Sequence, residues 1–163
     1  MIKEEEVDSM KKYLFLIVML LVSAALFGCG KREEGIPDLP NHETDWGLEI
    51  SLKDVTRTGV TLMFEHNGDV PEGELNTGQE YRLLEYKNQQ WIPVEYAVDT
   101  ENLCWDSAAY IINKNDKTEF EEDWSYLYGK LSKGTYAIEK EVLNWRAPGD
   151  YDKELYYAIF EIK

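Results

Sequence analysis

Leu48-Glu49-Ile50-Ser51-Leu52-Lys53 alternates apolar and polar side chains, and the next run, Val60-Thr61-Leu62-Met63-Phe64-Glu65, keeps an apolar side chain at every second position. A period of two residues places all the apolar side chains of a run on one face of a β-strand. His66-Asn67-Gly68-Asp69 ends the second run with residues that favour turns. The two runs therefore predict strands with one buried face, and they decide that the fold is built from β-structure.

Six further runs with strand-like composition follow, separated by turn residues about every ten positions. They span residues 80–87, 91–96, 108–112, 118–124, 134–142 and 155–162. Asn88-Gln89-Gln90 predicts a hairpin between the first two of these runs, and Arg146-Ala147-Pro148-Gly149-Asp150 predicts the turn of the final pair. No amphipathic pattern is long enough for a helix of three turns. About seven to eight short strands predict an all-β fold, either a β-sandwich or a small barrel.

One local pattern favours the sandwich over the barrel. Leu131-Ser132-Lys133-Gly134-Thr135-Tyr136 places a leucine, a turn glycine and a tyrosine at the start of a strand. This order resembles the tyrosine corner of immunoglobulin-type sandwiches, in which the hydroxyl bonds back to the preceding turn. The alternative is an ordinary buried tyrosine after a turn.

The N-terminal region has the features of an export signal. Met10-Lys11-Lys12 precedes an apolar run that ends in Leu26-Phe27-Gly28-Cys29. The final tetrad resembles the lipobox of bacterial lipoproteins, in which the cysteine receives a diacylglyceryl group, although Phe27 stands where a small residue is usual. The 18 uncharged residues between Lys12 and Lys31 would span about 27 Å as a helix, so an uncleaved membrane anchor is the alternative.

These features predict three segments. Residues 1–28 are expected to be a lipoprotein signal peptide, with Cys29 as the lipidated residue; the acidic prefix before Met10 suggests that Met10 is the true start. Residues 29–45 are polar, contain two prolines and show no period, which is typical of a flexible tether. Residues 46–163 form the predicted sandwich domain. The expected location is extracytoplasmic, on a cell membrane.

The charge balance excludes some partners. The chain carries 17 Lys and Arg against 32 Asp and Glu, for a net charge of −15. Such a chain repels nucleic acid and anionic lipid headgroups, so neither is expected as a direct partner. A cationic partner remains open, beside the simpler interpretation of a well-solvated acidic surface. The second cysteine, Cys104, lies between Leu103 and Trp105, and a buried, inert thiol is expected there. A disulfide between Cys29 and Cys104 is the rival if Cys29 carries no lipid.

No pattern specifies a reaction. The two histidines, His42 in the tether and His66 in a predicted turn, lack the setting of a catalytic triad. No zinc-ligand spacing and no glycine-rich phosphate loop occurs, so no catalytic residue, metal site or cofactor is expected. Glu119, Glu121 and Asp123 share one face of a predicted strand. They predict either a site for calcium or a cationic partner, or a charged outward face that discourages aggregation.

Aromatic residues are in excess of what a sandwich core needs. The tryptophans are Trp46, Trp91, Trp105, Trp124 and Trp145. Trp145 and its neighbour Arg146 precede Pro148-Gly149 in a predicted loop, where a tryptophan has less core to enter. These two residues are therefore the candidate contacts for a ligand or partner. The alternative is that Trp145 packs against the end of the sandwich.

A resemblance to a known family joins these features. Trp124-Ser125-Tyr126-Leu127-Tyr128-Gly129, followed by Gly134-Thr135-Tyr136, resembles the bacterial immunoglobulin-like domain of small Gram-positive lipoproteins. The resemblance covers residues 47–163 and implies a sandwich at the cell surface, with no catalytic residues. The function expected from it is a non-enzymatic binding module for an unknown ligand. The alternatives are a carbohydrate- or cell-wall-binding module that uses exposed aromatics and, less favoured, a glycan hydrolase with an acidic pair.

Overall fold

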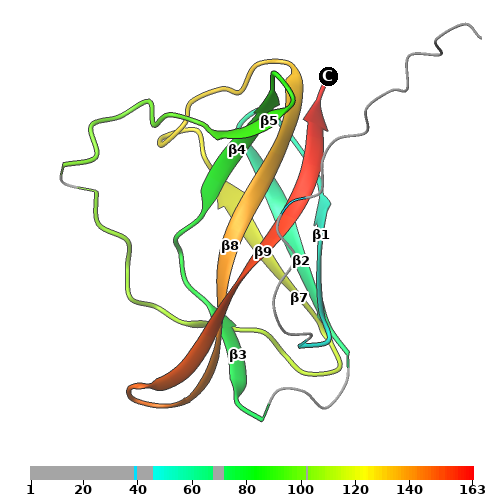
Figure 1. Cartoon of the computed structure of the whole chain (residues 1–163), viewed down its shortest axis with the longest axis vertical. Helices are drawn as coiled ribbons and strands as arrows, with labels where there is room; N and C mark the ends of the chain where they lie inside the picture. Colours follow the sequence, from blue (N-terminus) through cyan, green and yellow to red (C-terminus); the bar gives the residue numbers. More distant parts are fainter. Residues whose placement is uncertain (1–38, 40–45, 68–71, 102) are drawn as a thin grey trace, which may run out of the picture. The chain divides into compact units, whose positions relative to one another are not determined.

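The computed structural model describes residue 39 and residues 46–67, 72–101 and 103–163 (Figure 1). The predicted signal peptide, Cys29 and nearly all of the predicted tether lie outside these described residues. Within the described part of the chain, no helix has the length and apolar character needed to cross a membrane.

The described residues form nine strands in two antiparallel sheets. The first sheet has the order β1-β2-β7, and the second has the order β5-β4-β8-β3-β6, with β9 paired to the other side of β8. The strands are β1 (Leu48–Lys53), β2 (Gly59–His66), β3 (Glu74–Thr77), β4 (Arg82–Lys87), β5 (Gln90–Pro93), β6 (Tyr110–Ile111), β7 (Lys117–Asp123), β8 (Gly134–Ala147) and β9 (Asp150–Ile162). The described part of the chain is therefore an all-β sandwich, with one or two strands more than expected.

The first sheet shows why the alternating runs form strands. Leu62 and Phe64 of β2 are fully buried. On the other face of β2, Met63 and Glu65 are only partly buried, whereas Thr61 is buried. Ile138 and Val142 of β8 belong to the same core cluster and are also fully buried. Burial of these apolar faces from both sheets stabilises the fold by roughly 1.5–3 kcal/mol for each large side chain.

The predicted tyrosine corner is present. The Tyr136 hydroxyl donates a hydrogen bond to the carbonyl of Ser132 over 3.2 Å, and the Tyr136 ring stacks on Phe160 with centroids 5.7 Å apart. The strand arrangement agrees: β1-β2-β7 corresponds to strands A, B and E of an immunoglobulin sandwich, and β4-β8-β9 corresponds to strands C, F and G. The sandwich prediction is confirmed.

β8 and β9 are longer than predicted, with 14 and 13 residues. The first half of β8 pairs with β4 and the second half pairs with β3, so β3 and β4 follow one another along the same edge of β8. The far part of the β8–β9 hairpin forms the projecting end at the lower left of Figure 1. Gly149, with a φ of +79°, closes its turn.

Two further differences from the sequence prediction concern short segments. β3 was not predicted, and β6 is reduced to the two residues Tyr110 and Ile111. His66 does not lie in a turn: it is the last residue of β2 and it is buried. Its position continues the inward face of β2, which extends one step further than the apolar residues.

Candidate functional site

The candidate functional site is a pocket of about 580 Å³ at the side of the sandwich. One wall is the strand β7, where five consecutive residues, Glu119–Asp123, line the pocket. The connection between β3 and β4 contributes Gly78, Gln79 and Tyr81. The long connection between β5 and β6 contributes residues 103–105. Pockets of this size with a few convergent polar groups are the usual form of a ligand site.

An ion pair buried between the two sheets is part of this pocket. Lys140 of β8 is only 1% exposed, and its Nζ lies 2.6 Å from Oε1 of Glu122 on β7. The same Nζ donates to the carbonyl of Gln79 over 3.4 Å and lies 5.6 Å from the centre of the Tyr81 ring. The pair therefore joins β7 of the first sheet to β8 of the second.

The surroundings change the acidity of two pocket groups. Burial raises the pKa of Glu122, and the positive charge of Lys140 and its hydrogen bond oppose that rise. Burial also raises the pKa of the Tyr81 hydroxyl, and the nearby carboxylates of Glu122 and Asp123 add to the effect. Sequence reasoning missed both Glu122 and Lys140. The available signal was the position of Glu122 on the inward face of β7, in step with Phe120.

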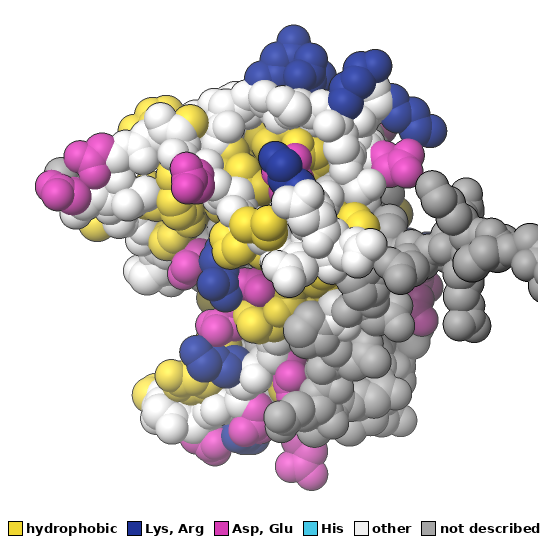
Figure 2. Space-filling view, turned by 45° about the horizontal axis from the view of Figure 1, so that its top comes forward, with side chains coloured by type: hydrophobic (Ala, Val, Ile, Leu, Met, Phe, Trp, Pro, Cys, Tyr) yellow, Lys and Arg dark blue, Asp and Glu magenta, His cyan; other side chains and the backbone are white. Residues whose placement is uncertain are grey.

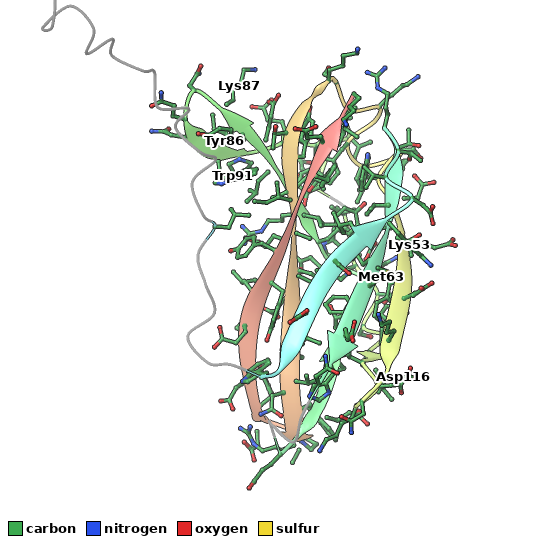
Figure 3. All side chains as sticks on the ribbon, turned by 90° about the vertical axis from the view of Figure 1, so that its right-hand side faces the viewer. Lys53, Met63, Tyr86, Lys87, Trp91 and Asp116 are labelled. Atoms are coloured by element: carbon green, nitrogen blue, oxygen red, sulfur yellow. The ribbon has the colours of Figure 1, made fainter. Side chains whose placement is uncertain are left out.

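The acidic residues on the other face of β7 lie as predicted. Glu119, Glu121 and Asp123 are exposed, while Phe120 and Glu122 between them are partly buried. Glu119 accepts a hydrogen bond from Lys53 of β1 over 2.6 Å. In Figure 3, Lys53 projects from β1 near the label of Met63 on β2.

Hydrogen bonding keeps one of these carboxylates ionised. Asp123 accepts a hydrogen bond from the backbone N–H of Ser125 over 2.7 Å, and bonds from Ser125 lower the pKa of this carboxyl group. Among the residues that the structure describes, no group of three or more His, Cys, Asp or Glu is placed to hold a metal ion.

Aromatic side chains form much of the remaining wall. The Tyr81 and Trp105 rings lie 5.7 Å apart, as do the rings of Tyr110 and Phe120. Tyr126 is 73% exposed at the pocket. Aromatic faces next to carboxylates suit ligands that combine apolar and positively charged groups.

Cys104 corrects an expectation. Its thiol is free and exposed, not buried, and it lines the pocket. Its neighbours Leu103 and Trp105 are the partly buried members of this segment and pack against the core. The segment runs along the surface, so the side chain between these two faces solvent.

The structure places Trp145 and Arg146 on a strand, not in the predicted loop. Both lie in β8 near the end of its hairpin with β9. Of the five tryptophans, all of which are described, only Trp145 is exposed, at 40%; its cross-strand partner, Tyr151, is 49% exposed. Figure 2 shows hydrophobic side chains beside charged ones on this projecting end, at the lower left.

Arg146 is held by two carboxylates of β9. Its guanidinium lies 2.7 Å from Asp150 and 2.7 Å from Asp152. The ladder between β8 and β9 is irregular between Trp145 and Ala147, which places Arg146 at a β-bulge. The hydrogen bonds that Arg146 donates to the two aspartates raise its pKa, so it stays charged. Trp145 and Arg146 do not line the pocket, so the structure does not bring them together with Lys140 and Glu122.

Comparison with known proteins gives one match. The model of a family described as "Bacterial Ig-like domain" matches residues 44–158, which is more than half of the chain. A search of curated proteins found no match, and a search of solved structures found none either.

Proposed function

The chain belongs to the family of bacterial Ig-like domains, and from this premise we propose that it is a non-enzymatic interaction module, held on the outer side of a cell membrane by a lipid on Cys29. The support for the anchor is the sequence before the domain: two lysines, an apolar run and a cysteine, followed by a polar segment with two prolines. A tether of this kind lets the domain reach away from the membrane. The binding partner is a protein on the cell surface.

The observation that carries the binding role is the aromatic pair at the end of the β8–β9 hairpin. Trp145 and Tyr151 are paired across the two strands and both are exposed, although burying such side chains would be favourable. Arg146 lies between them and the turn, fixed by Asp150 and Asp152. Tryptophan, tyrosine and arginine are the residues that most often dominate protein interfaces. The end of this hairpin is therefore the contact surface.

The experiment on binding uses isolated Gram-positive cell envelopes as the probe. Full-length chain in detergent micelles is expected to be retained saturably, and Trp145→Ala is expected to weaken retention at least tenfold. Val55→Ala removes another exposed apolar side chain and should leave retention unchanged. Protease treatment of the envelopes should abolish retention by a protein partner. Retention that survives protease but is released by a muramidase would instead support the carbohydrate-binding alternative, and retention unaffected by Trp145→Ala would contradict the proposed contact.

The experiment on the anchor follows a radioactive fatty acid into the chain in growing cells. Label is expected in the wild-type chain and absent from Cys29→Ala, which should also leave the membrane fraction. Cys104→Ala is the matched control, because it removes the other cysteine and should keep the label. Labelling that persists in Cys29→Ala would show that the lipobox interpretation is wrong.

A further inference from the structure

The outer edge of β7 has no paired strand among the described residues. β7 is the last strand in the order β1-β2-β7, and the first sheet therefore ends there with three strands. An edge strand presents a row of backbone N–H and C=O groups that can pair with another strand. At this edge lies the pocket, because consecutive residues from both faces of β7 line it.

The hydrogen-bond pattern shows which backbone groups point outward. The N–H of Trp124 donates to the carbonyl of Thr58 over 2.8 Å, and the carbonyl of Asp116 accepts from the N–H of His66. The backbone N–H and C=O groups of the even-numbered residues of β7 therefore point towards β2. The backbone N–H and C=O groups of the odd-numbered residues of β7 point towards the open edge. The carbonyl of Asp123 fits this pattern, since it accepts a hydrogen bond from the Tyr81 hydroxyl over 3.3 Å. The N–H and C=O groups of Glu119 and Glu121 remain, and they face the pocket side.

From this geometry we infer that an extended segment of a basic partner peptide binds along β7 as a fourth strand of the first sheet. Its backbone pairs with Glu119 and Glu121, as in other cases of strand addition to a sheet edge. Side chains of the peptide next to these two glutamates lie on the outer face, where a basic group is favoured beside Glu121. The alternate side chains point into the pocket towards Phe120, Trp105 and the other aromatic rings.

Charge selects this occupant over two others. Lys140 offsets Glu122, and Lys53 offsets Glu119, which leaves Glu121 and Asp123 as the carboxylates that attract a cation. An acidic peptide would place like charges beside them. A second copy of this chain pairing through its own β7 would set glutamates against glutamates, which is destabilising. A basic strand is the occupant that satisfies both the backbone and the charge.

The test uses synthetic peptides and the full-length chain in detergent micelles. The probe is acetyl-(Lys-Val)3-Lys-amide, titrated by calorimetry, with two versions that are N-methylated on alternate residues. One version has its methyl groups on the peptide edge that faces β7, and the other has them on the opposite edge. We expect the peptide methylated on the edge that faces β7 to lose at least tenfold in affinity. The peptide methylated on the opposite edge should stay within threefold. Equal affinities for the two, whether both are retained or both are lost, would overturn strand addition.

Variants test the charge and the location. Glu121→Lys is expected to weaken binding of the unmethylated peptide at least tenfold. Glu161→Lys makes the same change of charge on exposed β9 and should have less than a threefold effect. Equal effects of the two variants, or equal binding of acetyl-(Glu-Val)3-Glu-amide, would contradict the proposal. Trp145→Ala should leave peptide binding intact, because Trp145 does not line the pocket. The proposal of strand addition at β7 and the proposal of a contact at the hairpin are therefore tested separately.

Discussion

At the scale of single residues, the tyrosine corner makes a measurable contribution to stability. Tyr136→Phe removes the hydrogen bond to Ser132 but keeps the ring that stacks on Phe160. We expect the free energy of unfolding to fall by about 1 kcal/mol, the usual net value of one hydrogen bond. Urea unfolding measures it. Tyr126→Phe, at an exposed position, is the control and should change stability by less than about 0.5 kcal/mol; equal losses would contradict the role of the corner.

The buried ion pair between Lys140 and Glu122 is predicted to behave as a coupled unit. Lys140→Met leaves Glu122 buried without its cation and is expected to lower the free energy of unfolding by about 3–5 kcal/mol. The double variant Lys140→Met with Glu122→Leu should be more stable than Lys140→Met alone, because no unpaired charge remains. Denaturant unfolding of Lys140→Met, Glu122→Leu and the double variant at pH 7 measures the coupling, and additive losses would contradict it.

The pH dependence of Lys140→Met follows from the raised pKa of Glu122. Burial raises this pKa above that of the unfolded chain, and Lys140 normally opposes the rise. Without Lys140 the pKa rises further, and the folded state binds a proton that the unfolded chain at the same pH does not. The variant should therefore gain stability relative to wild type as the pH falls from 7 towards 4.5. Unfolding midpoints at pH 7, 6 and 5 test this, and a growing deficit at low pH would contradict it.

Sequence reasoning at this scale succeeded where one residue's environment follows from its neighbours. The tyrosine corner at Tyr136 was predicted from the residues just before it, and its hydroxyl does bond to Ser132. Trp145 was named as a candidate contact because turn residues follow it; it is exposed, although it lies on a strand. The prediction that Cys104 is buried was wrong, because apolar neighbours do not decide which way the side chain between them faces. Lys140 and Glu122 were missed since their pairing depends on how two sheets face each other, which no local pattern contains.

At the scale of elements, the β4–β5 hairpin offers a stabilising change. Asn88 and Gln89 both have positive φ, 52° and 63°, as a two-residue type I′ turn requires. Glycine adopts such a backbone without strain, so Gln89→Gly is expected to stabilise the domain by about 0.5–1 kcal/mol. Thermal unfolding measures the change. Gln90→Gly, within β5, is the control and should destabilise; a lower melting temperature for Gln89→Gly would contradict the prediction.

The strands that were predicted best are those with a clear period of two. β1, β2 and β7 were found within one or two residues of their ends because each alternates strictly between its two faces. The inward side chains of β1 and β2 are almost all apolar, and the outward side chains of β7 are all charged. β8 and β9 were predicted too short, since Asn144, Arg146 and the charged residues at 150–154 interrupt the apolar pattern next to the turn. β3 has four residues, too few to show a period. Which strands pair with each other depends on contacts between residues far apart in the chain, so local patterns could not predict the pairing.

At the scale of the whole molecule, the buried tyrosines predict loss of stability in alkali. Burial raises the pKa of Tyr157 to about 12, and it raises the pKa of Tyr81 and Tyr128 as well, from an ordinary value of 10.0. Above pH 10 the unfolded chain loses protons that the folded chain keeps, so the unfolded state is favoured. The urea midpoint should change little between neutral pH and pH 10 and fall between pH 10 and 12.

Two variants identify the groups responsible for the alkaline transition. Tyr81→Phe and Tyr128→Phe each remove one hydroxyl whose pKa is raised, so each should make the fall of the urea midpoint less steep. Absorbance at 295 nm follows the eleven tyrosines together, and part of their ionisation should occur above the ordinary pKa of 10.0. A fall of unchanged steepness in both variants would contradict the assignment.

The exposed thiol of Cys104 makes it possible to measure occupancy of the pocket beside β7 from the rate of a chemical reaction. The sequence contains two cysteines, so Cys29→Ser leaves Cys104 as the single thiol. Cys104 lines the pocket, and a peptide strand lying there competes with iodoacetamide for the same space. The rate constant for alkylation of Cys104 with peptide, divided by the rate constant without peptide, then reports the fraction of molecules whose pocket is free.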